Sequence, residues 1–200
     1  ENGCIRFGLS AIKGIGEKAI ESILEARARK KRFATLDDFL EEIDLMAVNK
    51  GAMESLVRAG AFDSIHPVRA RLFHSVDMLL ESGRRLQEDR ASGQGNLFDS
   101  APSGTRSGLA GELPEIEPWH DNVKLQHEKD VLGVYVSGHP LAKYEREIKT
   151  FACTGISALA GGQDSGEFSI VGIVSDLKAR ISKNGKRFAV GKLEDMEGAI

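Results

Sequence analysis

The chain has 200 residues, enough for one large domain or two small ones with a real core. Its composition, 41% hydrophobic and 28% charged, is typical of a soluble globular protein, and no apolar run is long enough to cross a bilayer. The formal net charge of −3 argues against a surface that binds nucleic acid by charge alone. Residues 1–90 are neutral and residues 91–130 carry a net charge of −4, so any contact with a polyanion has to be local.

The start of the chain and its cysteines indicate its context. The sequence begins at Glu1 and not at a methionine, and no signal peptide is recognisable, so we expect it to be part of a longer protein. Cys4 and Cys153 lie far apart without a Cys-x-x-Cys pair, and two thiols are too few for a disulfide scaffold. A reducing, cytoplasmic compartment is the expected location.

Residues 9–20 form the most informative stretch, because two glycines lie two positions apart in an apolar frame. Gly14 and Gly16 allow the backbone to turn sharply and bring bare N–H groups close to a ligand. Gly16 also opens a helix, whose unpaired N–H groups and positive dipole end attract an anion. The pattern predicts a helix-hairpin-helix, two short helices joined by a glycine turn that grips a nucleic-acid phosphate. Lys13 and Lys18 flank the turn and add charge.

The alternative is an ordinary helical hairpin whose turn is only structural. A bare G-x-G signal favours that alternative, whereas the matching apolar spacing of Ile12, Ile15, Ala19 and Ile23 favours DNA contact. A turn that touches two or three phosphates predicts a slope of about −2 to −3 for the logarithm of the binding constant against that of salt concentration.

Helix signals continue along the chain. The second helix of the hairpin is expected over residues 17–31, and its basic end, residues 27–32, suits either a helix C-terminus or a phosphate backbone. Thr35, Asn49 and Asp121 are the expected N-caps of later helices. Further helices are predicted over residues 36–43, 50–59, 68–86, 122–132 and 141–149. Residues 36–62 have the outline of a second hairpin without the G-x-G turn, from which we expect scaffolding.

Residues 91–117 are rich in Gly, Ser and Pro and are expected to form a flexible linker. Leu97 and Phe98 are two bulky apolar residues in this polar segment, and such pairs typically anchor in the pocket of another protein. The alternative is that they fold back on their own domain. Burying both side chains contributes about 3–6 kcal/mol to the binding free energy, and ordering the segment offsets part of that gain. We therefore expect micromolar or weaker binding.

From Phe168 onward the pattern changes to strands. Residues 168–174 are apolar and β-branched, and Asn184-Gly185 predicts a hairpin between residues 179–183 and 186–190. With under three strands a barrel cannot close, so we expect a partial sheet with an open edge. The residues that would suit single-stranded nucleic acid are Lys183, Lys186, Arg187 and Phe188. A solvated turn with one core phenylalanine is the alternative.

No constellation of residues predicts catalysis within the chain. Paired carboxylates, such as those at 37–38, are typical of exposed faces. His120, His127 and His139 lack the cysteine or close carboxylate that would complete a tetrahedral zinc site. Neither cysteine has the setting of a nucleophile, and no G-x-S-x-G or P-loop motif occurs. We therefore expect neither catalytic nor metal-binding residues here.

Four motifs, in this order, resemble the bacterial replicative polymerases, the alpha subunits of DNA polymerase III. They are the hairpin Gly8–Ala19, the helix end Leu56–Asp63, the pentapeptide Gln94–Phe98 and the stretch Glu128–Leu141. The strands from Phe168 look like the opening of the oligonucleotide-binding (OB) barrel that follows in that family. Each motif is weak alone, but the ordered set spans nearly the whole chain.

The resemblance implies roles for individual residues. The residues expected to hold the DNA backbone are Lys13, Gly14, Ile15, Gly16 and Lys18. Those expected to insert into a pocket of the sliding clamp, the beta subunit, are Gln94, Leu97 and Phe98. The parent would be a DNA-directed DNA polymerase whose catalytic aspartates and Mg²⁺ lie in a palm domain outside this chain. Duplex DNA, the clamp, other replicase subunits and, at the OB part, single-stranded DNA are the implied partners, and no membrane is expected.

The expected fold class is mainly α with a small β part: a helix-hairpin-helix domain followed by an incomplete OB-like barrel. The expected organisation is a duplex-binding helical domain (1–90), a linker with the clamp motif (91–117), a helical return segment of the same domain (118–150) and a truncated OB domain (151–200). Two other classes of function stay open. One is a stand-alone helix-hairpin-helix module of a repair or recombination protein, and the other is a protein–protein adaptor.

Overall fold

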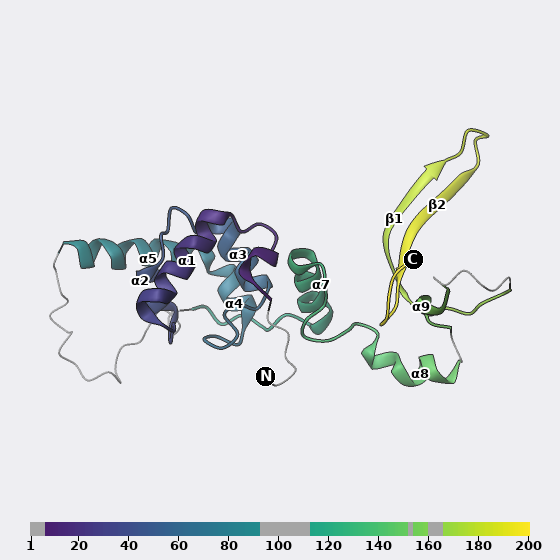
Figure 1. Ribbon diagram of the computed structural model, residues 1–200, viewed down its shortest axis with the longest axis horizontal. Helices are drawn as coiled ribbons and strands as arrows, with labels where there is room; N and C mark the ends of the chain where they lie inside the picture. Colours follow the sequence, from purple (N-terminus) through teal and green to yellow (C-terminus); the bar gives the residue numbers. More distant parts are fainter. Residues whose placement is uncertain (1–6, 93–112, 152–153, 160–165) are drawn as a thin grey trace. The chain divides into compact units, whose positions relative to one another are not determined.

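The computed structural model describes residues 7–92, 113–151, 154–159 and 166–200 (Figure 1). The chain divides into two compact units, Glu1–Tyr135 and Val136–Ile200, each of which is described by itself. The first unit is helical, and the strands of the described residues lie in the second. The fold class therefore agrees with the prediction of a mainly α chain with a small β part.

The helices of the first unit pack around one core. In chain order they are the 3-10 turn η1 (Leu9–Ala11) and the helices α1 (Glu17–Lys30), α2 (Leu36–Glu42), α3 (Lys50–Arg58), α4 (Arg69–His74), α5 (Val76–Ala91) and α7 (Asp121–Leu132). Helix α3 is central, since it contacts α4, α5 and α7. Its buried residues include Leu56 and Val57, and Phe62, which follows the helix, is buried as well.

Side-chain caps fix where α2 and α3 begin. Thr35 Oγ1 accepts a hydrogen bond from the Asp38 N–H at 3.1 Å, and Asp38 Oδ2 accepts one from the Thr35 N–H at 3.2 Å, which makes a complete capping box. Asn49 Oδ1 accepts from the Ala52 N–H at 3.0 Å and caps α3. Both predicted caps are therefore confirmed. Each satisfies N–H groups that would otherwise have no partner in the helix.

Three local expectations are wrong. The predicted helix over 68–86 is interrupted at Ser75, a poor helix former, where φ is −104° and ψ is 8°. The first helix of the hairpin shortens to the single turn η1, because Gly8 precedes it and Ile12 is already extended. Helix α7 is capped by His120, whose Nδ1 accepts from the Asn122 N–H at 3.4 Å, and not by Asp121.

Not every apolar residue on these helices is buried. The side chains of Leu24 on α1 and Val123 on α7 are exposed, whereas Ile23, Ala26 and Leu125 are buried. Only one stripe of each helix faces inward.

The second unit contains a long hairpin and short helices. Its elements are η2 (Ala142–Tyr144), α8 (Glu145–Thr150), α9 (Ile156–Leu159), β1 (Ile173–Ile181) and β2 (Arg187–Glu194). The strands pair antiparallel, with Ile181 opposite Arg187 next to the turn and Ile173 opposite Glu194 at the far end. The predicted Asn184-Gly185 turn is confirmed, with Gly185 at φ +75°. A register shift lies between Ser175 and Lys178.

The sheet is open, as the sequence predicted. It has two strands, to which a single bridge between Glu194 and Ala199 adds the start of a third pairing. The predicted strand over 168–174 forms only from Ile173. Upstream of Ile173, the described residues contain no paired strand. Instead, the Thr154 N–H donates one hydrogen bond of 2.9 Å to the Ser169 carbonyl.

Among the described residues, none of the helices combines the length and the apolar character that crossing a lipid bilayer requires.

Candidate nucleic-acid interface

The turn between η1 and α1 is exposed and bends at Gly14, whose φ is +87°. Gly16 then serves as the N-cap of α1, and its carbonyl accepts from the N–H groups of Ala19 and Ile20 at 3.0 and 3.1 Å. The N–H groups of residues 14–18 have no acceptor among the described residues. The start of α1 therefore offers donors and the positive end of a helix dipole, which together suit an anion.

Gly14 and Gly16 have different roles. A Cβ on Gly14 would lie 2.7 Å from Ser55 Oγ on α3, and its positive φ disfavours any other residue, so Gly14 is required by the fold. A Cβ on Gly16 would meet nothing within 4 Å, and its φ of −75° suits any residue. Neither packing nor backbone geometry within the chain requires a glycine at position 16. Its missing side chain leaves the amides open to a ligand.

The apolar frame of the hairpin fastens the turn to the core. Ile12, Ala19 and Ile23 are buried, and Ile15 is partly buried against the same cluster. The spacing that identified the hairpin in the sequence is therefore the spacing of its buried contacts. The amides of the turn are carried on a packed base, and a fixed array of donors loses little entropy when it binds.

Helix α7 supports the turn from a distant part of the sequence. The Lys13 N–H donates to the carbonyl of Val131, near the end of α7, at 2.8 Å. Gly133, at φ +78°, ends α7 directly afterwards. The sequence marked the stretch that contains Val131 as a family motif, but no spacing rule connects it with Lys13. This support was therefore missed.

A buried ionic network holds α7 against α3 and α4. The guanidinium of Arg69 binds Asp63 with two hydrogen bonds of 2.7 and 2.8 Å and Glu128 on α7 with one of 2.9 Å, and it also donates to the Arg58 carbonyl. Glu128 is fully buried. Burial lowers the pKa of Arg69, but its hydrogen bonds with Asp63 and Glu128 raise it above the ordinary value. Gly60 makes room, since a Cβ there would lie 2.2 Å from the guanidinium.

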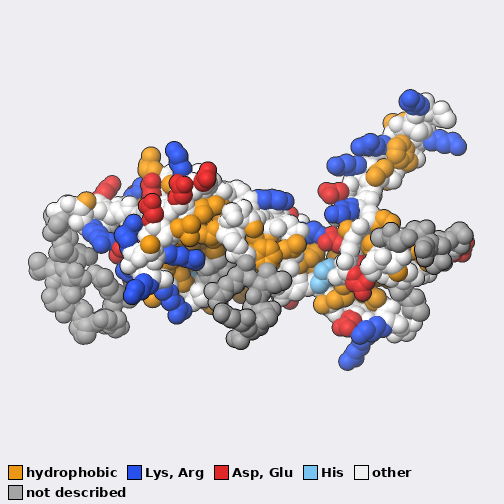
Figure 2. Space-filling model, in the orientation of Figure 1, with side chains coloured by type: hydrophobic (Ala, Val, Ile, Leu, Met, Phe, Trp, Pro, Cys, Tyr) orange, Lys and Arg blue, Asp and Glu red, His pale blue; other side chains and the backbone are white. Residues whose placement is uncertain are grey.

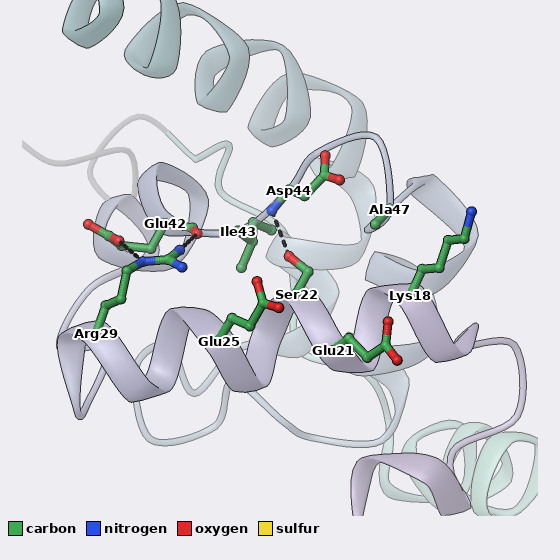
Figure 3. Close-up of a pocket in the computed structure, with 9 residues that line it drawn as sticks. All are labelled: Lys18, Glu21, Ser22, Glu25, Arg29, Glu42, Ile43, Asp44 and Ala47. Atoms are coloured by element: carbon green, nitrogen blue, oxygen red, sulfur yellow. Dashed lines mark hydrogen bonds and ion pairs between the residues drawn. The ribbon is translucent and has the colours of Figure 1, made fainter.

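The charge around the turn is mixed. Lys13 and Lys18 are exposed, and neither forms an ion pair with another described residue. Beyond Lys18, an open pocket of about 500 Å³ runs along α1 and is lined by the carboxylates of Glu21, Glu25 and Asp44 (Figure 3). Because these acids repel anions, the part of this helix that suits an anion is limited to the start of α1.

The pocket in Figure 3 is not a metal centre. Its Glu42 is bound by Arg29, and Ser22 Oγ accepts from the Asp44 N–H at 2.7 Å. Within the described part of the chain no group of three or more His, Cys, Asp or Glu side chains could hold a metal ion. His139, like His120, accepts a hydrogen bond from the backbone, here from the Leu141 N–H at 3.2 Å.

The other predicted site residues fall in two places. Gln94, Leu97 and Phe98 lie outside the described residues, as do Cys4 and Cys153. The residues near the tip of the β1–β2 hairpin are all exposed: Lys183, Lys186, Arg187 and Phe188. Figure 2 shows Lys and Arg side chains along this hairpin. With 45% of its surface exposed, Phe188 is not a core residue, so that alternative is wrong for the described structure.

Comparison with known proteins identifies the same hairpin. A family model described as a helix-hairpin-helix motif matches residues 1–72. This range contains the glycine turn and also residues 36–62, the predicted second hairpin.

Curated relatives match the chain along its whole length. The DNA polymerase III subunit alpha of Saccharopolyspora erythraea is 36% identical over 203 residues, which cover 98% of this chain and 17% of the relative. The subunit of Vibrio cholerae is 32% identical and covers 100% of this chain and 17% of the relative. That of Neisseria meningitidis is 37% identical, with 98% and 16% covered. The chain spans about one sixth of the length of these relatives, and it belongs to the family of DNA polymerase III alpha subunits.

Proposed function

We propose that this segment holds duplex DNA for a replicative DNA polymerase, through the amides of residues 14–18 and the side chains of Lys13 and Lys18. One observation carries the proposal. The N–H groups of residues 14–18 have no acceptor among the described residues, and position 16 is a glycine although the described fold does not require one there. A phosphate at this point would accept from several N–H groups at the positive end of α1.

Replacing Gly16 tests the proposal without disturbing the turn. Gly16→Ala and Gly16→Val add a Cβ that meets no atom of the described residues within 4 Å, and the added side chains would occupy the space of a bound phosphate. We expect duplex affinity at low salt to fall about tenfold or more for Gly16→Val and less for Gly16→Ala. Gly138→Val is the matched control, because Gly138 is also exposed and open. Equal affinity of Gly16→Val and the native chain would show that the turn is only structural.

We propose further that Gln94, Leu97 and Phe98 bind the sliding clamp. The support is the motif itself, a polar residue followed by two bulky apolar ones in a Gly- and Ser-rich segment, together with membership of the polymerase family. The test is capture of the native chain and of Leu97→Ala/Phe98→Ala by an immobilised bacterial sliding clamp. Asn96→Ala, in the same pentapeptide, is the control and should bind like the native chain. Equal capture of all three proteins would contradict the proposal.

The nucleotidyl transfer of the whole polymerase, with its Mg²⁺, is proposed to take place outside this segment. The support is that the family's polymerases are about six times longer than this chain, and that the sequence contains no constellation typical of phosphoryl-transfer chemistry. The isolated segment should not extend a primer when Mg²⁺ and nucleotides are supplied. Primer extension by the purified segment would overturn this assignment.

The β1–β2 hairpin is a second candidate interface, for single-stranded DNA. The observation in its favour is that Lys183, Lys186 and Arg187 are exposed beside the exposed ring of Phe188, which suits backbone contact and base stacking. Phe188→Ala should weaken binding of an oligothymidylate several-fold. Val190→Ala, an exposed apolar residue on the same strand, is the control. The hypothesis fails if the two substitutions have the same effect.

Of the alternatives, family membership favours the polymerase over an unrelated repair or recombination module, since the relatives match nearly the whole chain. The adaptor, in which the turn is structural, is the outcome that the Gly16 series would reveal.

A further inference from the structure

The basic run at the end of α1 divides into two sets with different surroundings. Arg29 binds Glu42 through Nε at 3.3 Å and the Glu42 carbonyl at 2.7 Å, and Lys30 Nζ lies 2.8 Å from Asp38 Oδ1. These two cations are neutralised by α2. Arg27, Lys31 and Arg32 form no ion pair with any described residue. Three basic residues of this run therefore have no acidic partner among the described residues, and favourable charge at the C-terminus of a helix does not by itself explain them.

The three unpaired cations lie on a groove of about 340 Å³, whose exposed surface is more polar than apolar. The remaining lining residues are Leu9, Ile23, Phe33, Phe39, Leu56, Ala61, Phe62, Ser64 and Ile65. They come from η1, α1, the α1–α2 connection, α2, α3 and the segment after α3, so several elements and not one loop build the groove. Ser64 is the one uncharged polar side chain among its lining residues.

The backbone at the rim is strained. Lys31 has φ +65° and ψ −46°, a region that residues other than glycine rarely adopt. The Arg32 N–H donates to the Lys30 carbonyl at 2.8 Å and closes a turn of three residues. Such strain persists where the surrounding structure holds it, which is often at a binding site. Here the strained residue and the one after it are two of the cations of the rim.

We propose that this groove docks an acidic peptide of a protein partner, whose carboxylates meet the three cations and whose apolar residues contact Leu9 and Ile65. The three unpaired cations suit the carboxylates, and the partly buried Leu9 and Ile65 offer a small apolar contact beside them. The volume is that of a small-ligand site, enough for an anchor residue and its neighbours.

Nucleic acid fits the groove less well. A duplex presents phosphates and sugars but no apolar group that could reach the floor. Single strands bind by stacking bases on exposed ring faces. The rings here pack edge-on into each other, Phe33 on Phe39 at 5.3 Å and Phe39 on Phe62 at 5.0 Å between centroids, and all three side chains are buried. They leave no ring face for a base.

The groove and the glycine turn can be tested separately, although Leu9 of η1 lines the groove. The turn lies at the N-terminus of α1, and Lys31 follows its C-terminus 14 residues after Glu17, which is about 21 Å along a helix. Changes at one end can therefore be tested without changing the other, and the proposal stands whether or not the turn binds DNA.

The probe is a fluorescein-labelled peptide, Asp-Glu-Asp-Phe-Leu-Asp-Glu-Asp, and its binding to the full chain is measured by anisotropy at low salt. Two control peptides separate the contributions: one with Asn and Gln in place of every acid, and one with Ser-Ser in place of Phe-Leu. Both should bind at least several-fold more weakly. Binding of the acidic peptide should also weaken at high salt, because exposed charges are screened.

Two pairs of substitutions locate the site. Lys31→Gln/Arg32→Gln removes cations of the rim, and Arg29→Gln/Lys30→Gln removes the same charge from the side that faces α2. We expect about threefold to tenfold weaker peptide binding for the first pair, from two exposed charge contacts, and little change for the second. Ser64→Trp fills the groove while keeping its charge and should abolish binding. Gly16→Val should leave peptide binding unchanged.

Several results would overturn the proposal. Equal loss in both charge pairs would mean nonspecific attraction, and undiminished binding to Ser64→Trp would place the peptide elsewhere. If an oligothymidylate bound to the chain and lost affinity with Lys31→Gln/Arg32→Gln while the peptide did not, the groove would be a nucleotide site. Circular dichroism of each variant ensures that a loss of binding is not a loss of fold.

Discussion

Glu128 and Arg69 illustrate what single residues contribute to the interface. Glu128 is completely buried, and its carboxylate forms an ion pair with the guanidinium of Arg69, which also binds Asp63. A charge removed from water is tolerated only when it is paired. Because α7 also supplies the carbonyl that accepts from the Lys13 N–H, the ion pair stabilises the support of the glycine turn as well as the core.

Removing one partner should therefore destabilise the first unit strongly. Glu128→Ala is expected to lower the free energy of unfolding by about 3 kcal/mol, because Arg69 keeps its charge but loses a buried partner. Urea unfolding followed by circular dichroism measures the change. Glu81→Ala, whose exposed carboxylate pairs with Arg84 and Arg85, is the control and should change stability by less than about 1 kcal/mol. A similar small effect of Glu128→Ala would contradict the role given to the pair.

Histidine residues give the first unit a defined dependence on pH. Burial lowers the pKa of His127 below its ordinary value of 6.5, and the positive charge of Arg58 lowers it further. Its ring packs edge-on against Trp119, with 4.2 Å between centroids. Burial also lowers the pKa of His66. In both cases the unfolded chain takes up a proton at a higher pH than the folded one.

The free energy of unfolding should then decrease as pH falls. The stabilising effect of the neutral rings is complete above the ordinary histidine pKa and is lost as pH falls toward the lower pKa of the folded state. Urea unfolding between about pH 7.5 and about pH 5.5 measures it, a range above the titration of most carboxylates. In His127→Gln the decrease should be smaller but still present, because His66 remains. An unchanged pH dependence in His127→Gln would contradict the burial effect on this ring.

Among individual residues, sequence and structure agree wherever the reason is local. The helix cap at Thr35 and the tight turns at Gly14 and Gly185 depend on the chemistry of one or two neighbouring residues, and each is where the pattern predicts it. The ion pair of Arg69 with Glu128 joins residues 59 positions apart, so no periodicity could reveal it. The same holds for the bond between Lys13 and Val131.

Whole elements were predictable to the extent that their own sequence determines them. Helices α1, α2, α3 and α7 begin and end within a residue or two of their predicted bounds, because caps and glycines mark their ends. The interruption at Ser75 was not predictable, because apolar residues continue on both sides of it and the backbone leaves the helical region for a single residue. Strand β1 begins later than predicted because a strand also needs a pairing partner, and its pairing with β2 begins only at Ile173.

The end of α1 is an element boundary with strain that substitution can remove. Lys31→Gly is expected to raise the free energy of unfolding by about 0.5–1 kcal/mol. A lysine at this positive φ carries a penalty of about 1–2 kcal/mol, which glycine does not. Part of this gain is lost because glycine has more conformational freedom in the unfolded chain. Chemical denaturation gives the difference. Lys30→Gly, one position earlier and inside the helix, should instead lower stability by about 1 kcal/mol. If Lys31→Gly were also destabilising, the strain at the groove would not exist.

For the whole molecule, charge sets how DNA binding responds to salt. The chain carries a net charge of −3, and only Lys13 and Lys18 are basic residues of the proposed contact. The logarithm of the duplex binding constant should fall with the logarithm of salt concentration at a slope of about −2 to −3. Titrations at several salt concentrations give the slope, and Lys18→Gln should reduce its magnitude by about 1. A much steeper slope would mean that DNA covers other basic residues, such as those of the β1–β2 hairpin.

The two units should differ in whether they fold alone. The first buries a large apolar cluster, whereas the buried apolar side chains in the described part of the second are Leu141 and Ile156. Most of the β1–β2 hairpin is exposed on both faces, and an isolated hairpin is at best marginally stable in water. A fragment of residues 1–135 should therefore unfold cooperatively on heating, with a sigmoidal change in circular dichroism, while a fragment of residues 136–200 shows only a gradual change.

The sequence groups residues 118–150 with the helical domain, and a third fragment, residues 1–150, tests that grouping. If residues 136–150 pack on the helices, this fragment should melt at a higher temperature than residues 1–135, and if they do not, the two should melt together. A sigmoidal transition in residues 136–200 alone would mean that the hairpin and its short helices form a core of their own.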